Sequence, residues 1–312
     1  MSRPIIAPAP LRLSRRSVVA AVFAVALAAC ASRGAPASPS PLPNPDALNV
    51  ATTTTVFADI VKNIGGPTVT VTSIIPAGVG PEDYEPKPGD AKTVADADLI
   101  VSNGVGLDAF LDRLLAAGGG TPAQLILGAG LPAIDVDGEP NPHFWLDPTI
   151  VKTGYLPKIV AALNAARPSQ AAMFEQNAAT YGAELDRLDA DLRAEVATIP
   201  EANRKLVTFH DAFPYFAKHF GFQLIGVVVA NVGQEPTPAE LADLVRTVKA
   251  AGVKAVFSES QFNPKLADTL AQEAGITQVV TTLYNDTLGP SPADTYVGMM
   301  RFNMQQIVAA LR

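Results

Sequence analysis

The residues of this chain best suited to metal chemistry are its three histidines, His143, His210 and His219. His143 and His210 lie in predicted loops or at strand ends, and each is followed closely by an acidic residue. His219 falls inside a predicted helix, and we expect a structural or surface role for it. Imidazole and carboxylate groups together suit Zn²⁺, Mn²⁺ or Fe²⁺. The pattern therefore indicates a site for a divalent transition-metal ion.

Two further loops carry carboxylates that can complete such a site. One follows a predicted strand and holds Glu82, Asp83 and Glu85, and the other follows the last predicted strand and holds Asp286. Ligands of parallel α/β proteins bind beyond the carboxyl ends of the strands. Because His210 also follows a predicted strand, we expect these side chains to meet in one cleft.

The elements that position these loops follow an alternating pattern. Two stretches of the chain alternate short β-branched runs with helical patterns, which is typical of parallel α/β sheets. The first stretch has predicted strands at 49–53, 68–75, 99–102 and 124–127, and helices at 56–64, 90–95 and 107–116. The second has strands at 205–209, 224–229, 255–258 and 278–282, and helices at 213–219, 238–250, 264–273 and 292–311.

One long helical pattern, from about residue 168 to residue 199, separates the two stretches. Its apolar positions recur three or four residues apart, at Phe174, Ala178, Tyr181, Leu185, Leu188, Leu192 and Val196. Pro168 suits a first helical turn, and Pro200 ends the helix. We interpret this helix as a rigid spine joining two lobes. A coiled-coil dimer is the alternative, but the apolar stripe is rich in alanine and lacks a clear charge code beside it.

The N-terminus indicates export. Arg15 and Arg16 precede a small-apolar run at residues 18–29, which matches a signal peptide and is too short to span a bilayer. The run ends in LAAC, which resembles the lipobox of bacterial lipoproteins, and Cys30 is the only cysteine of the chain. We therefore predict that Cys30 is lipidated and anchors the protein to the outer face of the cell membrane. The Pro-, Ser- and Ala-rich segment that follows is typical of a tether.

These patterns predict an α/β protein with two lobes, each built on a mainly parallel sheet flanked by helices and joined by the spine helix. The expected divisions are a signal peptide at 1–29, the lipidated cysteine and tether at 30–47, an N-terminal lobe at 48–166, the spine at 167–200 and a C-terminal lobe at 201–312.

Composition and charge favour a folded protein and argue against nucleic-acid binding. The chain has 312 residues, is 48% hydrophobic and 17% charged, and carries a net charge of −7. These values suit a packed, folded protein. Four of the basic residues lie in the first 29 positions, which hold no acidic residue, so the remainder is more acidic still. Because nucleic-acid phosphates need basic partners, we expect no nucleic-acid binding.

Four motifs, in this order, resemble the zinc/manganese-type solute-binding proteins of bacterial ABC importers: DYEP, NPHFWLDP, TFHDAFPYFAKHFGF and YNDTLG. The resemblance extends from about Leu48 to the C-terminus. It implies two α/β lobes joined by one long helix, with a single divalent ion, Zn²⁺ or Mn²⁺, held in the cleft by four side chains. Fe²⁺ suits the same ligand types. It also implies delivery to an ABC permease and its ATPase by a monomeric receptor.

The resemblance assigns the metal ligands residue by residue. His143, His210 and Asp286 match the second, third and fourth ligands of the family, whose first ligand is usually a histidine in P-H-x-Y-E-P. This chain reads PEDYEP, so Glu82 stands at the first position, with Asp83 or Glu85 as alternatives. Two histidines and two carboxylates resemble the manganese binders, whereas a histidine at the third position resembles the zinc binders. The metal therefore stays open between Zn²⁺ and Mn²⁺.

Two acidic residues are candidates for supporting the ligands rather than binding the ion. Asp211 directly follows His210 and is placed to orient it or to begin the next helix. Glu259 lies past a predicted strand end and is expected to face the same cleft.

Three alternative functions fit the sequence less well. A mononuclear metal hydrolase needs an open coordination position and a general base, and the chain has neither an H-E-x-x-H pair nor a G-x-S-x-G turn. A surface adhesion lipoprotein would leave the ligand set without a purpose. A receptor for a larger chelate such as a siderophore needs arginine or aromatic walls, and the four ligand loops carry no arginine.

Overall fold

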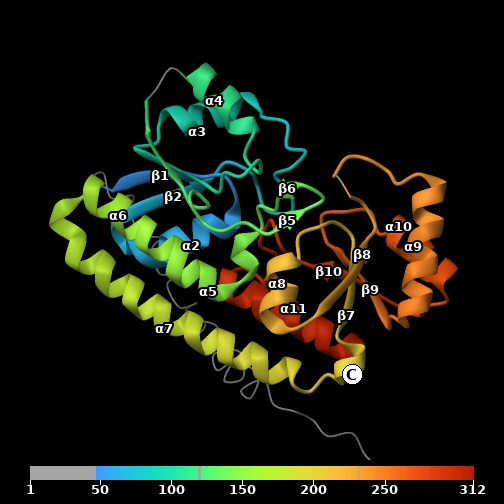
Figure 1. Ribbon diagram of the computed structural model, residues 1–312. Coiled ribbons are helices and arrows are strands. Elements are labelled where there is room, and N and C mark those ends of the chain that lie inside the picture. The colour runs from blue at the N-terminus through green and yellow to red at the C-terminus, as the bar shows by residue number, and fades with distance from the viewer. Residues whose placement is uncertain (1–46, 119–120, 231) are drawn as a thin grey trace, which may run out of the picture. The chain divides into compact units, whose positions relative to one another are not determined.

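A sheet of four parallel strands lies at the centre of the N-terminal half of the protein, which we define as residues 47–166 (Figure 1). The computed structural model describes residues 47–118, 121–230 and 232–312. The strands lie in the order β2-β1-β3-β4, with bounds β1 (Leu48–Thr52), β2 (Val69–Ser73), β3 (Leu99–Ser102) and β4 (Ala123–Ile126). Their many Val, Ile, Leu and Thr side chains suit a pleated, partly buried surface.

Helices connect these strands, as the alternating pattern predicted. They are α2 (Thr55–Gly65), α3 (Pro88–Ala95) and α4 (Phe110–Gly118). Helix α2 buries Val56, Phe57, Ile60 and Val61, which share one face because they lie one, three or four residues apart. This face packs against β2 and against the long helix that joins the two halves.

The chain between β4 and the long helix contains elements that the sequence patterns did not predict. They are β5 (Asp135–Val136), β6 (Glu139–Pro140), η2 (Phe144–Leu146), α5 (Pro148–Ile150), the π-helical turn η3 (Val151–Tyr155) and α6 (Leu156–Ala166). The first two form an antiparallel hairpin. Asp147 caps α5 by accepting a hydrogen bond from the backbone N–H of Thr149. Short elements of this kind are set by local hydrogen bonds and give no periodic signal.

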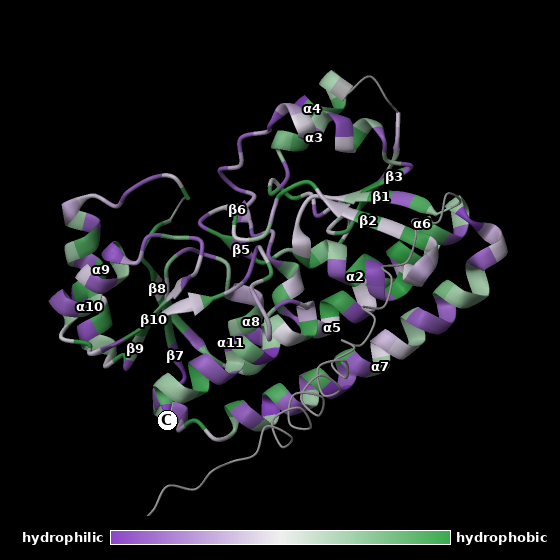
Figure 2. Ribbon diagram, turned by 180° about the vertical axis from the view of Figure 1, so that it is seen from behind, coloured by the Kyte–Doolittle hydropathy of each residue, from purple (hydrophilic) through white to green (hydrophobic). Residues whose placement is uncertain are grey.

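The long helix α7 (Ala171–Val196) runs beside both halves of the protein (Figure 1). A short turn, η4 (Pro168–Gln170), precedes it. Its ribbon alternates hydrophobic and hydrophilic residues along its length (Figure 2), and its buried side chains recur at the predicted spacing. It contacts α2 and α6 of the N-terminal half and α8 and α11 of the C-terminal half. At 1.5 Å per residue, its 26 residues span about 39 Å.

The C-terminal half, residues 201–312, contains two pairs of parallel strands. The strands are β7 (Lys205–Thr208), β8 (Gln223–Val227), β9 (Ala255–Glu259) and β10 (Gln278–Leu283), and the pairs are β7–β8 and β9–β10. β7 also contacts β9. The short turn η5 (Glu201–Asn203) precedes the strands. Helices lie between and after them: α8 (Pro214–Phe220), α9 (Pro238–Ala251), α10 (Lys265–Ala274) and α11 (Tyr296–Leu311).

The predicted start of the last helix, at residue 292, was wrong. Helix α11 begins at Tyr296 because Thr295 caps it, with the Thr295 hydroxyl accepting a hydrogen bond from the N–H of Gly298. The residues before the cap form a separate turn, in which the N–H of Ala293 donates to the carbonyl of Pro290.

One apolar core passes through both halves of the protein. It joins side chains of α2, α7 and α11, including Phe57, Leu185 and Met299, to Trp145 and Phe144 of η2. Two smaller cores lie within the halves, one around β1 and α4 and one around β9 and α10. The parallel sheets, the flanking helices and the long helix together confirm the predicted α/β class. The shared core also gives the loops of both halves a common support.

The predicted signal peptide, Cys30 and tether lie outside the described residues, except for Ala47 at the end of the tether. Within the part of the chain that the structure describes, no helix is long and apolar enough to cross a membrane.

Candidate metal centre

The four predicted ligands come from four separate loops. Glu82 lies between β2 and α3, and His143 directly precedes η2. His210 follows β7 and Asp286 follows β10. The two ligands of the C-terminal half thus stand at the carboxyl ends of parallel strands, where such sheets place their binding residues.

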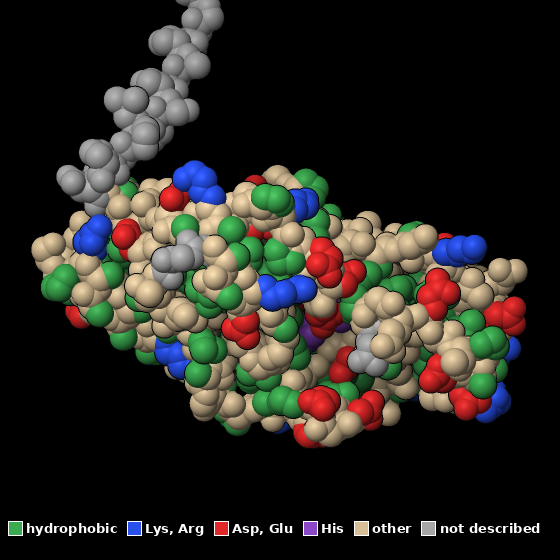
Figure 3. Space-filling view, turned by 90° about the horizontal axis from the view of Figure 1, so that it is seen from above, with side chains coloured by type: hydrophobic (Ala, Val, Ile, Leu, Met, Phe, Trp, Pro, Cys, Tyr) green, Lys and Arg blue, Asp and Glu red, His purple; other side chains and the backbone are tan. Residues whose placement is uncertain are grey.

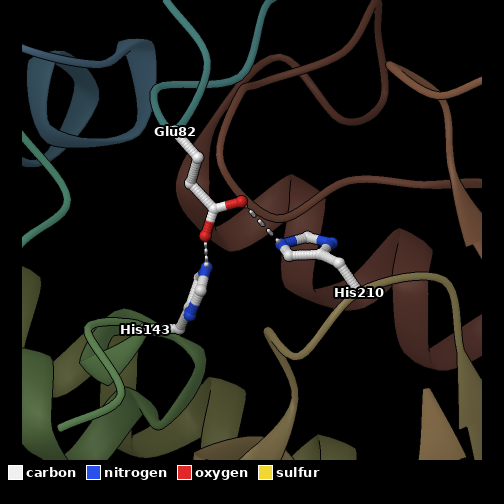
Figure 4. A group of neighbouring side chains, drawn as sticks. All are labelled: Glu82, His143 and His210. Carbon is white, nitrogen blue, oxygen red and sulfur yellow. Dashed lines mark ion pairs between the residues drawn. The ribbon is translucent and has the colours of Figure 1, made fainter. Parts of the chain in front are cut away.

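The structure brings these four side chains together. Glu82, His143 and His210 form a group whose potential ligand atoms all lie within 4.8 Å of one another (Figure 4). Oε1 of Glu82 is 3.7 Å from Nε2 of His143, and Oε2 of Glu82 is 3.9 Å from Nε2 of His210. The carboxylate of Asp286 lies between the same imidazoles, at 3.4 Å from His143 and 3.5 Å from His210.

These separations suit four atoms around one ion. In a tetrahedron with metal–ligand bonds of about 2.1 Å, neighbouring ligand atoms are about 3.4 Å apart. The four measured separations range from 3.4 to 3.9 Å. Each carboxylate faces the two imidazoles with different oxygens, Oε1 and Oε2 for Glu82 and Oδ1 and Oδ2 for Asp286. To enclose one ion, the side chains must therefore shift so that one oxygen of each carboxylate points to it.

His143 is oriented by Asn141, two residues earlier in the same motif. Oδ1 of Asn141 lies 3.1 Å from Nδ1 of His143 and also accepts a hydrogen bond from the His143 backbone N–H. An amide oxygen is only an acceptor, so Nδ1 carries the proton and Nε2 presents its lone pair toward Glu82 and Asp286. The side-chain amide of Asn141 donates to the backbone carbonyl of Asp211, at 2.7 Å. Asn141 thereby links the loops of both histidines.

His210 is backed by a buried carboxylate. Oε1 of Glu259, the last residue of β9, lies 3.1 Å from Nδ1 of His210. On the other side of the ring, the amide nitrogen of Asn285 lies 3.2 Å from Nε2. Burial alone would lower the pKa of His210, but Glu259, Asp286 and Glu82 together raise it to about 10. The carboxylates thus create a strong demand for positive charge at this ring.

The two carboxylate ligands have different environments. Asp286 is 1% exposed, and one of its oxygens accepts a hydrogen bond from the amide of Gln261 at 2.7 Å. Burial would raise the pKa of Asp286, but His143, His210 and Gln261 outweigh burial and lower it. The side chain of Glu82 is 26% exposed, and burial raises its pKa against the opposing effect of the two histidines.

The charges at this site call for a cation. When both imidazoles are neutral, as metal ligation requires, the two carboxylates give the site a formal charge of −2, and the carboxylate of Glu259 adds to it. Among the described residues, no lysine or arginine forms an ion pair with Glu82, Asp286 or Glu259. Nε2 of His143 and Oδ1 of Asp286 are buried and make no hydrogen bond within the described structure. Buried polar atoms of this kind ordinarily have a partner, and a divalent ion fits all of these observations.

Three of the predicted ligands, Glu82, His143 and His210, line a cavity of about 840 Å³. In the space-filling view, a histidine lies at the bottom of a hollow with acidic side chains around it (Figure 3). Four carboxylates stand in the lining, at Glu82, Asp137, Glu139 and Asp211, and the lining residues that the structure describes include no lysine or arginine. A path from solvent to the ligands therefore exists on the Glu82 side.

The other predicted site residues lie differently. Asp211 bonds Asn141 through its backbone and side chain, so its contact leads to His143 rather than to the ring of His210. It does not cap the next helix, because Phe213 is the N-cap of α8. Glu85 is 85% exposed and lies 4.0 Å from Arg113, and Asp83 is also exposed. Of the three acidic residues in this loop, it is Glu82 that the structure places beside the histidines.

His219 is a structural residue, as expected, and is 8% exposed. Its ring lies between the carboxylates of Asp147 and Asp189. Asparagines 141 and 285 and Gln261 were missed as site residues. Asn141 and Asn285 stand inside the quoted motifs, two residues before His143 and one before Asp286, and an amide directly beside a predicted ligand was the only available signal.

Comparison with known proteins agrees with the geometry. Residues 50–310 match the family described as zinc-uptake complex component A, periplasmic. The chain is 32% identical over 270 residues to the manganese-binding lipoprotein MntA of Halalkalibacterium halodurans, covering 85% of this chain and 89% of that protein. It is 31% identical over 296 residues to the iron-binding protein YfeA of Yersinia pestis, covering 92% and 94%.

Solved structures show the same likeness. The periplasmic zinc-binding protein TroA of Treponema pallidum superposes with a TM-score of 0.78 at 28% identity, covering 85% of this chain and 99% of that chain. An Mn-bound periplasmic metal-binding protein of Candidatus Liberibacter asiaticus gives a TM-score of 0.76 at 28% identity, covering 85% and 100%. On the family match and these relatives, the chain belongs to the ZnuA family, the component A proteins of zinc-uptake complexes.

Proposed function

We propose that this protein is an extracytoplasmic receptor that captures one divalent transition-metal ion and delivers it to an ABC import permease with its ATPase. The ligands are Glu82, His143, His210 and Asp286, and Cys30 carries a lipid that holds the receptor at the outer face of the cell membrane. The observation that carries the proposal is the convergence of four side chains from four loops at 3.4 to 3.9 Å. The relatives named as metal-binding lipoproteins support it.

The ion is Mn²⁺ or Zn²⁺, and Fe²⁺ suits the same ligands. Two carboxylates neutralise a divalent charge and favour the harder ions, whereas the two imidazoles suit zinc and iron. Affinity for a mixed nitrogen and oxygen site rises from Mn²⁺ through Fe²⁺ to Zn²⁺. The ion that the receptor carries in a cell therefore depends on availability as well as on the site.

Capture fits this ligand set better than catalysis. A hydrolytic metal site keeps one coordination position open for water. Four protein ligands complete a tetrahedral shell and leave no such position. The arrangement therefore favours holding an ion and passing it on, in a receptor that acts as a monomer.

The test is the metal content of the purified mature protein and of three variants, Glu82→Ala, His143→Ala and Asp83→Ala, after reloading and removal of free metal. We expect one ion per chain in the unmodified protein and in Asp83→Ala, and its loss in the other two variants. Asp83 is the matched control because it lies beside Glu82 and is exposed.

Two outcomes would contradict the proposal. Metal retained by Glu82→Ala but lost from His143→Ala would mean a three-ligand site with an open position, which is the arrangement of a hydrolase. A protein that holds no metal in any form, even after reloading, would remove the basis for the receptor function.

A further inference from the structure

The loop that carries Glu82 is attached to the C-terminal half at one point. Residues 76–86 leave β2 and reach across to the loop after β10. Among the residues that the structure describes, a single hydrogen bond joins this loop to the C-terminal half. The backbone N–H of Gly78 donates to the hydroxyl oxygen of Thr287, at 2.9 Å. Thr287 directly follows the ligand Asp286. One hydroxyl thus links the loops of the two carboxylate ligands.

Thr287 is held in place by a small network of hydrogen bonds, in which each donor can be matched to an acceptor. The N–H of Leu288 donates to the hydroxyl oxygen of Thr55, at 2.8 Å. The Thr55 hydroxyl, at 3.3 Å from that of Thr287, can then donate to it, and the Thr287 hydroxyl faces the carbonyl of Leu288 at 3.3 Å. The oxygen of Thr287 accepts twice and its proton is donated once, so every donor has an acceptor. Thr287 is 1% exposed, so water cannot replace these bonds.

The loop needs such an attachment because the negative charges of Glu82 and Asp286 repel each other. Glu82 and Asp286 face the same two imidazoles, and each carboxylate raises the cost of charging the other. Gly78 has a φ of +82°, which a residue with a side chain rarely adopts, and this conformation directs its N–H to Thr287. Gly80 passes so close that a Cβ there would lie 3.3 Å from Gln261 and 3.9 Å from Asp286.

We propose that Thr287 is the positioning residue that holds the Glu82 loop over the metal, so that breaking its bond to Gly78 precedes release of the ion. This inference rests on the proposed function. Glu82 is the ligand on the solvent side, because its side chain is 26% exposed whereas His143, His210 and Asp286 are 1 to 2% exposed. An ion that leaves toward the cavity must therefore lose Glu82 first, and Thr287 controls how readily it does so.

The experiment measures the rate of metal release into excess chelator for the unmodified protein and for Thr287→Val, Thr287→Ser and Thr52→Val. Trp145, the only tryptophan, has its ring centroid 5.1 Å from that of His143 and reports occupancy by fluorescence. Thr52 is the matched control, since it is buried and its hydroxyl bonds only the nearby carbonyl of Thr54. Valine keeps the shape of threonine but cannot accept the bond from Gly78.

We expect Thr287→Val to release metal about five- to tenfold faster, the size of effect that loss of one buried hydrogen bond produces. Thr287→Ser and Thr52→Val should release metal at the rate of the unmodified protein. In a Glu82→Gln background, Thr287→Val should change the rate much less, because the loop no longer brings a charged ligand. A purely structural role of Thr287 would give the same change in both backgrounds.

Equal release rates for Thr287→Val and the unmodified protein would overturn the inference while leaving the receptor function intact. Equal effects of Thr287→Val and Thr52→Val would also overturn it. Should Thr287→Val not fold, hydrogen exchange of the Gly78 amide in the unmodified protein decides instead. Slow exchange that slows further with metal supports the bond, and fast exchange in both states refutes it. If the unmodified protein binds no metal, the proposed function itself fails.

Discussion

The two sides of the metal site are built differently. On one side, His143 and His210 are each 2% exposed, and Asn141 and Glu259 lie against their Nδ1 atoms. On the other side, Glu82 extends from a surface loop, is 26% exposed, and depends on the attachment of that loop through Gly78. The histidines are thus held by polar partners before an ion arrives, whereas a single hydrogen bond among the described residues joins the loop of Glu82 to the C-terminal half.

The two sides suit two different tasks of a receptor: holding the ion, and admitting and releasing it. Fixed, desolvated imidazoles hold the ion tightly because they lose little freedom on binding. A carboxylate on an exposed loop can move aside and return, so it is suited to admit and release the ion. It is also the position at which the sequence predicts a carboxylate in place of a histidine, and a different side chain on this exposed loop would not disturb the core.

The largest effect is expected from removing a fixed ligand. His143→Ala and His210→Ala should each lower metal affinity by well over 100-fold, more than the 10- to 100-fold typical for loss of an outer partner of a ligand. Glu82→Ala should lower it less than the histidine variants, because the exposed Glu82 position is easier for water to fill, but still enough that the ion is lost when free metal is removed. Competition titration with a chelator of known affinity measures all three. A larger loss for Glu82→Ala than for the histidine variants would reverse the comparison.

The next effect concerns the support behind His210. Glu259→Gln removes the charge beside Nδ1 while keeping the shape of the side chain, and we expect metal affinity to fall by about 10- to 100-fold. Glu273→Gln, at an exposed site on α10, is the control and should leave affinity unchanged. An unchanged affinity in Glu259→Gln would show that His210 needs no support from β9.

The residue at position 82, on the exposed side of the site, should determine which ion is preferred. Glu82→His restores an imidazole at the first position and should raise the ratio of Zn²⁺ to Mn²⁺ affinity by about tenfold, because imidazole suits zinc and carboxylate suits manganese. Titration of both ions into the same preparation measures the ratio. No change in the ratio would place the control of selectivity on the buried side.

The last prediction concerns folding stability rather than metal affinity, in the scaffold below the histidines. The ring of His219 lies 3.1 Å from Asp147, four residues after His143, and 2.5 Å from Asp189 of α7. Burial would lower the pKa of His219, but the two carboxylates outweigh it and raise the pKa above its usual 6.5. Each ring nitrogen faces one carboxylate, so a doubly protonated ring donates to both. The resulting ion pairs join α8, which follows His210, to the loop of His143 and to α7.

Because the folded-state pKa of His219 is raised, its contribution to stability is complete below pH 6.5 and is lost as the pH rises through the raised value. His219→Gln should therefore lower the free energy of unfolding by about 1 to 3 kcal/mol at pH 6, and by less in alkaline solution. Urea denaturation at a series of pH values measures this. A loss that is independent of pH would mean that His219 contributes by packing alone.

Most of the fold could be predicted because its strands and long helices have strong periodic patterns. The strand β3 was predicted with its bounds, and the face of α7 with Leu185 and Leu188 follows from spacing alone. The π-helical turn η3 and the start of α11 could not be predicted. A π-helical turn has no period of its own, and the choice of Thr295 as cap over the proline at 292 depends on the turn before it.

The site, like the fold, has a part that could be predicted from the sequence and a part that could not. The histidines and Asp286 stand in motifs that a sequence shows directly, and the structure places them together. The link from Asn141 to Asp211 and the link from Thr287 to Gly78 could not be predicted, because each joins residues of different halves. Such contacts depend on how the halves pack across the shared core, and no local pattern records that.

The lining of the cavity has a consequence for kinetics. Its four carboxylates, without a basic residue among the described lining, create a negative potential that draws divalent cations inward and accelerates their encounter with the ligands. Dissolved salt screens this attraction over about 10 Å at 0.1 M. The association rate should therefore fall as ionic strength rises, while the dissociation rate, set by contacts inside the site, stays nearly constant. The salinity of the surroundings then sets how quickly the receptor fills.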